Sequence, residues 1–289
     1  MLTAPEIAAA DIEAAAADAR QAALAVGVLV RPPESDSDLR ALIAVGEAVW
    51  GMGGTLAPNE LRALVHAGGV VLGAWEAHDD LAAPVGFLLG FLGWRDGLHL
   101  HSHQTGVLPG HHGRGVGYAL KLAQREICLR HGVAEVRWTF DPMIRRNTSF
   151  NISKLGAAAV RFLPEFYGRM DDTINSDDLS DRLEAVWTLT APLPGTGPTR
   201  ARPAAERPAL RALVARDGWP EVIDTPPSAG NHLAVPEDFA TLRHSDPPRA
   251  RAWRLAVRSV LETGYASGLR IVDVDVDGYV FGASAVCRG

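Results

Sequence analysis

A glycine-rich stretch in the middle of the chain constrains the fold most. Residues 107–117 read Val-Leu-Pro-Gly-His-His-Gly-Arg-Gly-Val-Gly, so an apolar strand end passes through a proline turn into alternating glycines. A helix is predicted to follow them directly. Glycine lets the backbone approach a ligand closely, and the first N–H groups of a helix have no partner within that helix. The stretch is therefore typical of a loop that holds a phosphate or diphosphate.

Two common phosphate-binding loops do not fit this spacing. A Walker loop requires a lysine after its last glycine, and the only lysines of the chain are Lys121 and Lys154. A Rossmann loop would require glycine at Tyr118 or Leu120, directly after an apolar strand. Asp141 lies downstream at a distance that would suit the acidic residue of a Rossmann fold. However, the first strand of that fold is normally an apolar run, and the strand before these glycines alternates polar and apolar residues. A Rossmann fold is therefore disfavoured.

The periodicity of the remaining segments predicts an α/β domain with a mixed sheet. Ser35 or Asp36 can cap a helix, and Gly132 can end another. Loop 51–54, rich in glycine, is either a plain turn or the border of an acceptor pocket. Helices are expected at 5–24, 36–50, 118–131 and 147–155, and strands at 26–31, 70–75, 84–94, 98–107, 134–141, 160–166 and 183–189, with a turn near 79–80.

A different region follows residues 191–208, which are rich in proline, glycine and arginine and are predicted to be a linker. Beyond it we expect helices at 236–243 and 247–267 and a hairpin of strands 269–276 and 279–286. The three alternating aspartates of this hairpin match half of a calcium-binding loop. Ser284 stands where such a loop requires glutamate, so the sequence favours a hairpin over a calcium site. This extension could lengthen the sheet, cover an acceptor site or form a homodimer.

Two motifs give the central region a family resemblance. Residues 112–117 resemble Gln/Arg-x-x-Gly-x-Gly/Ala, the diphosphate loop of the GNAT acetyltransferase superfamily, with His112 in the first position. Residues 147–156 resemble its second signature, and the run 138–142 resembles a bacterial branch. The resemblance covers about residues 26–189. It implies a mixed, mostly antiparallel sheet flanked by helices, with an acyl-CoA such as acetyl-CoA as co-substrate.

The sequence predicts four regions, the second of which is identified by this resemblance. They are an N-terminal helix at 1–25, an acyltransferase domain at 26–190, the linker at 191–208 and a C-terminal helix and hairpin extension at 209–289. A CoA-dependent N-acyltransferase acting on a small amine or amino acid is the main hypothesis. A CoA-binding sensor or scaffold without catalysis is the alternative.

Three histidines, His99, His101 and His103, alternate on the strand before the loop, so their side chains share one face. A neutral imidazole can accept the proton that an amine loses during acylation. The resemblance implies the same role, since His101 lies where the family often carries a glutamate base, and the pair is similar to that of the arylalkylamine N-acetyltransferases. His101 and His103 are the candidate catalytic residues, against the alternative of structural sheet histidines.

A His-x-His pair on a strand can also bind a metal. The residues after His103 are Gln104, Thr105, Gly106 and Val107, so the carboxylate that such a site usually adds is missing. No metal is expected.

The resemblance also assigns residues to the cofactor. A backbone N–H near Val107 would polarise the thioester carbonyl, and the family's tyrosine acid aligns with Ile152, so Tyr167 or solvent would have to supply that proton. Arg145 and Arg146 either bind a carboxylate or are solvated. Lys154 is expected at the surface. The candidate cofactor-binding residues are Val107, His112, Gly113, Arg114, Gly115, Val116, Gly117 and Asn147; for Arg114 a solvated surface position, and for Asn147 a helix cap, are the alternatives.

Composition excludes other classes of protein. The formal net charge of −6 over 289 residues argues against non-specific nucleic-acid binding, which needs a basic face. Two cysteines, Cys128 and Cys287, are too few for a disulfide framework. The acidic N-terminal segment resembles neither a secretory signal nor a membrane span, so we expect a cytoplasmic protein without a membrane partner.

Overall fold

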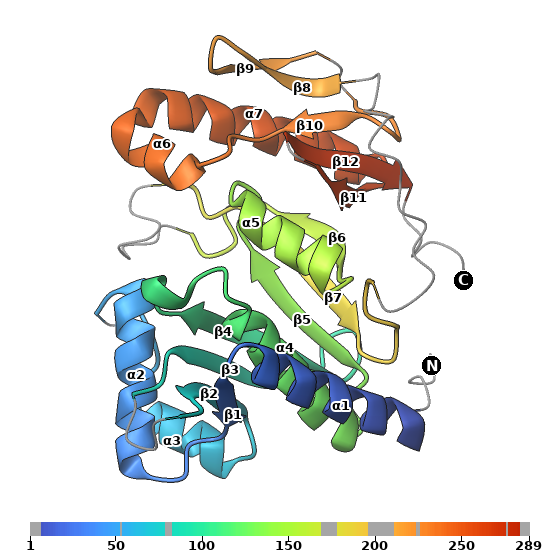
Figure 1. The fold of residues 1–289 in the computed structure, drawn as a ribbon. Helices are drawn as coiled ribbons and strands as arrows, with labels where there is room; N and C mark the ends of the chain where they lie inside the picture. The colour runs from blue at the N-terminus through green and yellow to red at the C-terminus, as the bar shows by residue number, and fades with distance from the viewer. Residues whose placement is uncertain are drawn as a thin grey trace. The chain divides into compact units, whose positions relative to one another are not determined.

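The computed structural model describes residues 7–52, 54–78, 83–168, 178–195, 211–223, 226–275 and 277–283 (Figure 1). These residues form two compact units. The first holds the described residues up to Trp138 together with Thr188–Ala191, and the second holds the others from Thr139 onward. Most of the predicted linker, the predicted turn near 79–80, Ser284 and Cys287 lie outside the described residues. The domain boundaries at 26–190 and 209–289 stay a prediction.

The first unit follows the predicted order of elements. The N-terminal helix and the helix after the glycine loop are both present, and Ser35 caps the helix Asp36–Trp50 by accepting a hydrogen bond from the backbone N–H of Asp38 at 3.1 Å. The short helix α3, which begins at Pro58, was not predicted. The elements are α1 Ala9–Ala25, β1 Val28–Arg31, α2 Asp36–Trp50, α3 Pro58–His66, β2 Val70–Glu76, β3 Gly86–Gly93, β4 His99–Val107, α4 Val116–Arg130 and β5 Glu135–Phe140.

The strands form a seven-stranded sheet in the order β1-β2-β3-β4-β5-β7-β6, where β6 is Ala158–Leu163 and β7 is Arg182–Thr188. The pairs β1–β2, β2–β3, β3–β4 and β6–β7 are antiparallel, and β4–β5 is parallel. The prediction of a mixed, mostly antiparallel sheet flanked by helices is therefore confirmed.

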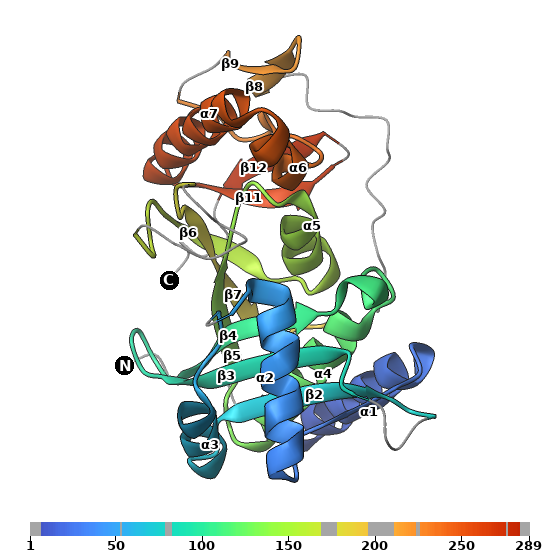
Figure 2. The same ribbon diagram turned by 90° about the vertical axis from the view of Figure 1, so that its left-hand side faces the viewer.

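Helices cover both faces of the first unit's strands. α2 crosses β3 and β4 on one face (Figure 2), and its residues Leu39, Leu42 and Val45 share a buried cluster with Phe87 and Leu89 of β3. α4 packs on the other face, and α1 packs against α4 (Figure 1). Burial of this apolar surface on two sides holds β4, the strand that leads into the glycine loop, in place.

The second unit contains more strands than the sequence predicts. The two expected helices are present, and the expected hairpin belongs to a five-stranded sheet in the order β11-β12-β10-β8-β9, in which β8, β9 and β10 were not predicted. The hairpin itself is confirmed, and the predicted helix 147–155 consists of an α-helical turn followed by a π-helical one. The elements are α5 Arg145–Thr148, the π-helical turn Ser149–Lys154, β8 Arg211–Arg216, β9 Trp219–Val222, β10 His232–Ala234, α6 Phe239–Ser245, α7 Pro247–Ala266, β11 Leu269–Val274 and β12 Gly278–Ala283.

One apolar core holds the second unit together. α7 turns Trp253, Val257 and Val260 toward strand residues that include Leu233 and Phe281. Met143 is buried in the same cluster, with Ile144, Ile152 and Phe162 packed against it. Residues 143–162 therefore share their core with the C-terminal extension.

Candidate functional site

The glycine loop has a backbone that requires glycine. After the short 3₁₀ turn Pro109–His111, Gly113 has φ +74° and Gly115 has φ +99°. Both values lie in the left-handed region, which costs a residue with a side chain about 1 kcal/mol or more. Gly115 is also close to Val26, since an added Cβ would lie 2.9 Å from its Cγ1 atom. The spacing of the glycines thus reflects a defined loop shape.

The loop presents five backbone donors. In the described part of the chain, no hydrogen-bond acceptor is found for the N–H groups of residues 113–117, whereas the next two N–H groups, of Tyr118 and Ala119, both donate to the carbonyl of Gly115. α4 begins at Val116 and runs for 15 residues, so the positive end of its dipole lies at the same place. Such a group of donors can accommodate an anion with several oxygens.

His112 binds the protein itself. Its Nε2 atom lies 2.7 Å from the carbonyl oxygen of Val107 and donates to it. The ring therefore joins the loop to the end of β4. Arg114 is exposed, and Val116 is buried beneath the loop. The direct roles predicted for these residues toward a cofactor stay predictions.

A β-bulge in β4 lies at one of the three histidines, and the rings of two of them are close together. Gly90 pairs with Ser102 and Leu89 pairs with Gln104, so His103 is the extra residue of the bulge. The ring centroids of His101 and His103 are 6.0 Å apart, and Phe91 lies 5.2 Å from the first and 5.8 Å from the second. These three rings are called the aromatic cluster below.

The histidines differ in their surroundings. His99 is buried, and its Nδ1 atom lies 2.9 Å from the carbonyl oxygen of Gly97, which is a structural contact. The His103 residue is exposed to solvent. Neighbouring protein atoms nevertheless desolvate its ring, and this lowers its pKa below the usual value. This desolvation favours the neutral imidazole of His103, the form that can accept a proton.

Loop 51–54 is attached to the same strand. Gln104 donates from Nε2 to the carbonyl of Gly54 at 2.6 Å and accepts from the hydroxyl of Thr55 at 2.9 Å. Both bonds are made by the residue next to His103. The predicted choice between a plain turn and a pocket border is still open, but the part of the loop after residue 53 is anchored beside the aromatic cluster.

Sequence reasoning missed a buried lysine under this strand. Lys121 of α4 is 3% exposed, and its Nζ atom donates to Ser102 at 2.7 Å and to Gln124 at 3.2 Å. The ammonium group lies 4.1 Å from the ring centroid of Trp138. Desolvation lowers the pKa of Lys121 to about 7. The sequence does contain a signal for this buried group, because Lys121 occupies an apolar position of a helix that packs on the sheet.

The second unit holds the other predicted residues. Asn147 lies on α5, where Thr148 donates to the hydroxyl of Tyr279 at 2.9 Å and this hydroxyl donates to the carbonyl of Pro142 at 2.5 Å. Ile152 packs against the C-terminal core. Tyr167 shares a 3.1 Å hydrogen bond with Thr139. The roles proposed for Asn147 and Tyr167 are not tested by these contacts.

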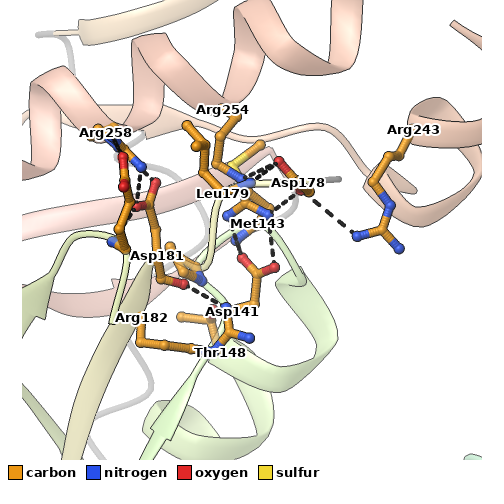
Figure 3. A network of polar contacts seen from close by, with 12 residues as sticks. Asp141, Met143, Thr148, Asp178, Leu179, Asp181, Arg182, Arg243, Arg254 and Arg258 are labelled. Atoms are coloured by element: carbon orange, nitrogen blue, oxygen red, sulfur yellow. Dashed lines mark hydrogen bonds and ion pairs between the residues drawn. The ribbon is translucent and has the colours of Figure 1, made fainter. Parts of the chain in front are cut away.

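Buried ion pairs stabilise the start of this segment (Figure 3). Arg254 of α7 is 1% exposed and contacts Asp141 through two bonds of 2.6 and 2.8 Å, and it also reaches Asp178 at 2.6 Å. Arg258 pairs with Asp181 at 2.5 Å. Although burial opposes it, the Arg254 guanidinium lowers the pKa of Asp141 below its usual value. Asp141 is thus a structural ion-pair partner.

Two further observations concern the described residues alone. No group of three or more histidine, cysteine, aspartate or glutamate side chains comes together there as a metal site would require. Among their helices, none has the length and apolar character needed to cross a membrane.

Comparisons with known proteins give structural likeness only. No protein-family model matches the chain, and no curated protein matches it. Naa20 of Chaetomium thermophilum, in complex with a bisubstrate analogue, is 17% identical over 55% of this chain and 86% of its own, with a TM-score of 0.45. The ribosomal-protein-S18-alanine N-acetyltransferase of Escherichia coli is 13% identical over 57% and 96%, with a TM-score of 0.45. The protein yncA of Salmonella typhimurium, with its cofactor acetyl-CoA, is 17% identical over 56% and 94%, with a TM-score of 0.44.

Proposed function

We propose that this chain is an acyl-CoA-dependent N-acyltransferase that acts on a small amine or amino acid, with acetyl-CoA as the expected donor. The observation that carries the proposal is the set of N–H groups at residues 113–117, at the start of α4, for which the described residues offer no acceptor. These donors suit the diphosphate of CoA. The resemblance of residues 112–117 and 147–156 to the GNAT signatures supports the same ligand. The proposal includes a cytoplasmic location and no metal.

In the proposed reaction the amine nitrogen attacks the thioester carbonyl. A C–N bond forms, the C–S bond breaks, and CoA leaves as its thiolate. His101 or His103 accepts the proton that the amine loses, which requires a neutral imidazole, and the lowered pKa of His103 meets that requirement. A backbone N–H near Val107 would stabilise the negative charge on the carbonyl oxygen.

One observation favours the second candidate, a CoA-binding sensor. Ile152 occupies the position of the family's acidic tyrosine, and its side chain is part of the packing of the second unit. A sensor would bind acyl-CoA but release no thiol. A thiol-release assay over a panel of amines separates the two candidates, since an N-acyltransferase frees CoA in proportion to acylated amine.

The loop is tested with a matched pair of variants, Gly113→Ala and Gly132→Ala. The two glycines have φ +74° and +75°, and at neither would an added Cβ have an atom within 4 Å. Both variants should therefore lose about 1 kcal/mol of stability. Only Gly113→Ala shifts the loop donors, so it should weaken acetyl-CoA binding about tenfold or more in calorimetry. Wild-type protein that does not bind acetyl-CoA would refute the proposed function.

A further inference from the structure

The bulge in β4 places two neighbouring side chains on the same face of the sheet. Leu89 of β3 packs with α2, whereas Gly90 faces α4. Gln104 pairs with the first and Ser102 with the second, and His103 is the extra residue between them. The His103 ring lies in the aromatic cluster. His103 and Gln104 therefore share the α2 face, and Ser102 faces α4.

Loss of the bulge would shift this part of β4 by one residue. His103 would then pair with Leu89, and Gln104 would pair with Leu88, which is fully buried on the α4 face. The Gln104 amide would lose its bonds to the end of loop 51–54 and enter an apolar layer. The contacts that hold the bulge therefore decide where the His103 ring lies.

Both neighbours of His103 are held by side-chain hydrogen bonds. Gln104 is bonded to the end of loop 51–54 on the α2 face. On the opposite face, Ser102 accepts from the Nζ atom of Lys121 at 2.7 Å, and both residues are buried, so water does not compete for this bond. The bond joins the bulge to α4, a helix of 15 residues that packs on the sheet.

Lys121 can keep this bond in either protonation state. Its Nζ atom donates to Ser102 and, at 3.2 Å, to Gln124, and a neutral amine still has the two N–H groups that these bonds need. The lowered pKa of Lys121 means that the folded chain holds the ammonium less favourably than water does. The lysine thus costs stability near pH 7, and its contact with the bulge gives it a role that stability does not.

We propose that Lys121 is a positioning residue that acts through Ser102 on His103. By holding Ser102 from the α4 face, it keeps the bulge at the place where the His103 ring meets Phe91 and His101. The inference rests on the proposed function, in which this cluster accepts the proton of the amine. A displacement of about 1 Å can lower a rate about a hundredfold, so turnover depends on a lysine that is buried away from the cluster.

The test removes each partner of the bond in turn. Lys121→Met and Ser102→Ala should each lower kcat about tenfold to a hundredfold, with the affinity for acetyl-CoA within about twofold of wild type. Both should also weaken the nuclear Overhauser contact between the rings of Phe91 and His103, whose centroids are 5.8 Å apart. Thermal melts show which variants are folded, and if one of the two is not, the other decides.

Gln124→Met is the matched control. Gln124 is as deeply buried as Lys121, and its replacement removes the other hydrogen bond of the same Nζ atom while the bond to Ser102 stays. This variant should therefore keep the wild-type kcat and the wild-type ring contact.

The outcomes separate this inference from the proposed function. A wild-type kcat or an unchanged ring contact in Lys121→Met or Ser102→Ala, or equal losses in Gln124→Met, would overturn the positioning role alone. Wild-type protein that does not bind acetyl-CoA would overturn the proposed function. The ring contact would then still decide whether Lys121 holds His103 in place.

Discussion

At the scale of single residues, the aromatic cluster is where proton transfer is proposed to occur. The double variant His101→Ala/His103→Ala should lower turnover by about 10²- to 10⁴-fold, because general-base catalysis contributes that much. Its affinity for acetyl-CoA should stay within about twofold of wild type. His66→Ala, an exposed histidine at the end of α3, is the control. Unchanged turnover in the double variant would remove both histidines from the mechanism.

The pH profile adds a second readout of the same prediction. The pKa of His103 is lowered, so the imidazole gains its proton only below the ordinary histidine range. A base must be unprotonated to act, and kcat/KM should therefore fall as the pH drops, with a midpoint below about 6.5.

Lys121 should make stability depend on pH. Its pKa of about 7 in the folded chain is below the unfolded value, so between these two values the unfolded chain binds more protons than the folded one. The free energy of unfolding should rise by about 1 kcal/mol per pH unit from pH 7.5 to 9.5. Lys121→Met should remove most of this slope in urea titrations. A slope equal in both proteins would show that Lys121 is not responsible.

At the scale of elements, β4 organises the site because three consecutive residues of this strand each position a different feature. His103 forms the bulge, Ser102 accepts from Lys121 on the opposite face, and Gln104 holds the end of loop 51–54. The alternation of His99, His101 and His103 correctly predicted a strand. It could not predict the bulge, since an extra residue shows itself only in the pairing with β3.

The attachment of loop 51–54 can be measured through Gln104. Gln104→Leu loses both of its hydrogen bonds and should cost about 1–3 kcal/mol of stability, while Thr55→Val loses one and should cost less. If the loop borders the acceptor site, KM for the amine should rise in Gln104→Leu with unchanged affinity for acetyl-CoA. An unchanged KM would leave the loop as a plain turn.

At the scale of the whole molecule, the C-terminal extension is built into the second unit. Arg254 of α7 neutralises Asp141 and Asp178, which lie far apart in the sequence (Figure 3). Tyr279 of β12 contacts Thr148 and Pro142 in the same segment. The ends of α7 and the hairpin could be predicted from the sequence, but the partners of these side chains could not.

Removing the central guanidinium should destabilise this unit strongly. Arg254→Met leaves two carboxylates without their main partner, which should cost about 3–5 kcal/mol in chemical denaturation. Because the pKa of Asp141 is lowered in the folded chain, the stability from its ion pair is present above the unfolded pKa near 3.8 and is lost as the pH falls. Arg251→Met, an exposed arginine of the same helix, should cost little. Equal losses in both variants would contradict a central role for Arg254.

Features that depend on neighbours along the chain could be predicted from the amino-acid sequence alone. The glycines at positive φ, the helix that starts after them and the alternation of β4 follow from local steric and periodic preferences. Tertiary structure alone decided which side chains meet. The burial of Lys121, the contact of Phe91 with two histidines and the ion pairs of Arg254 join residues distant in sequence. Their energies come from packing and desolvation, which no local pattern records.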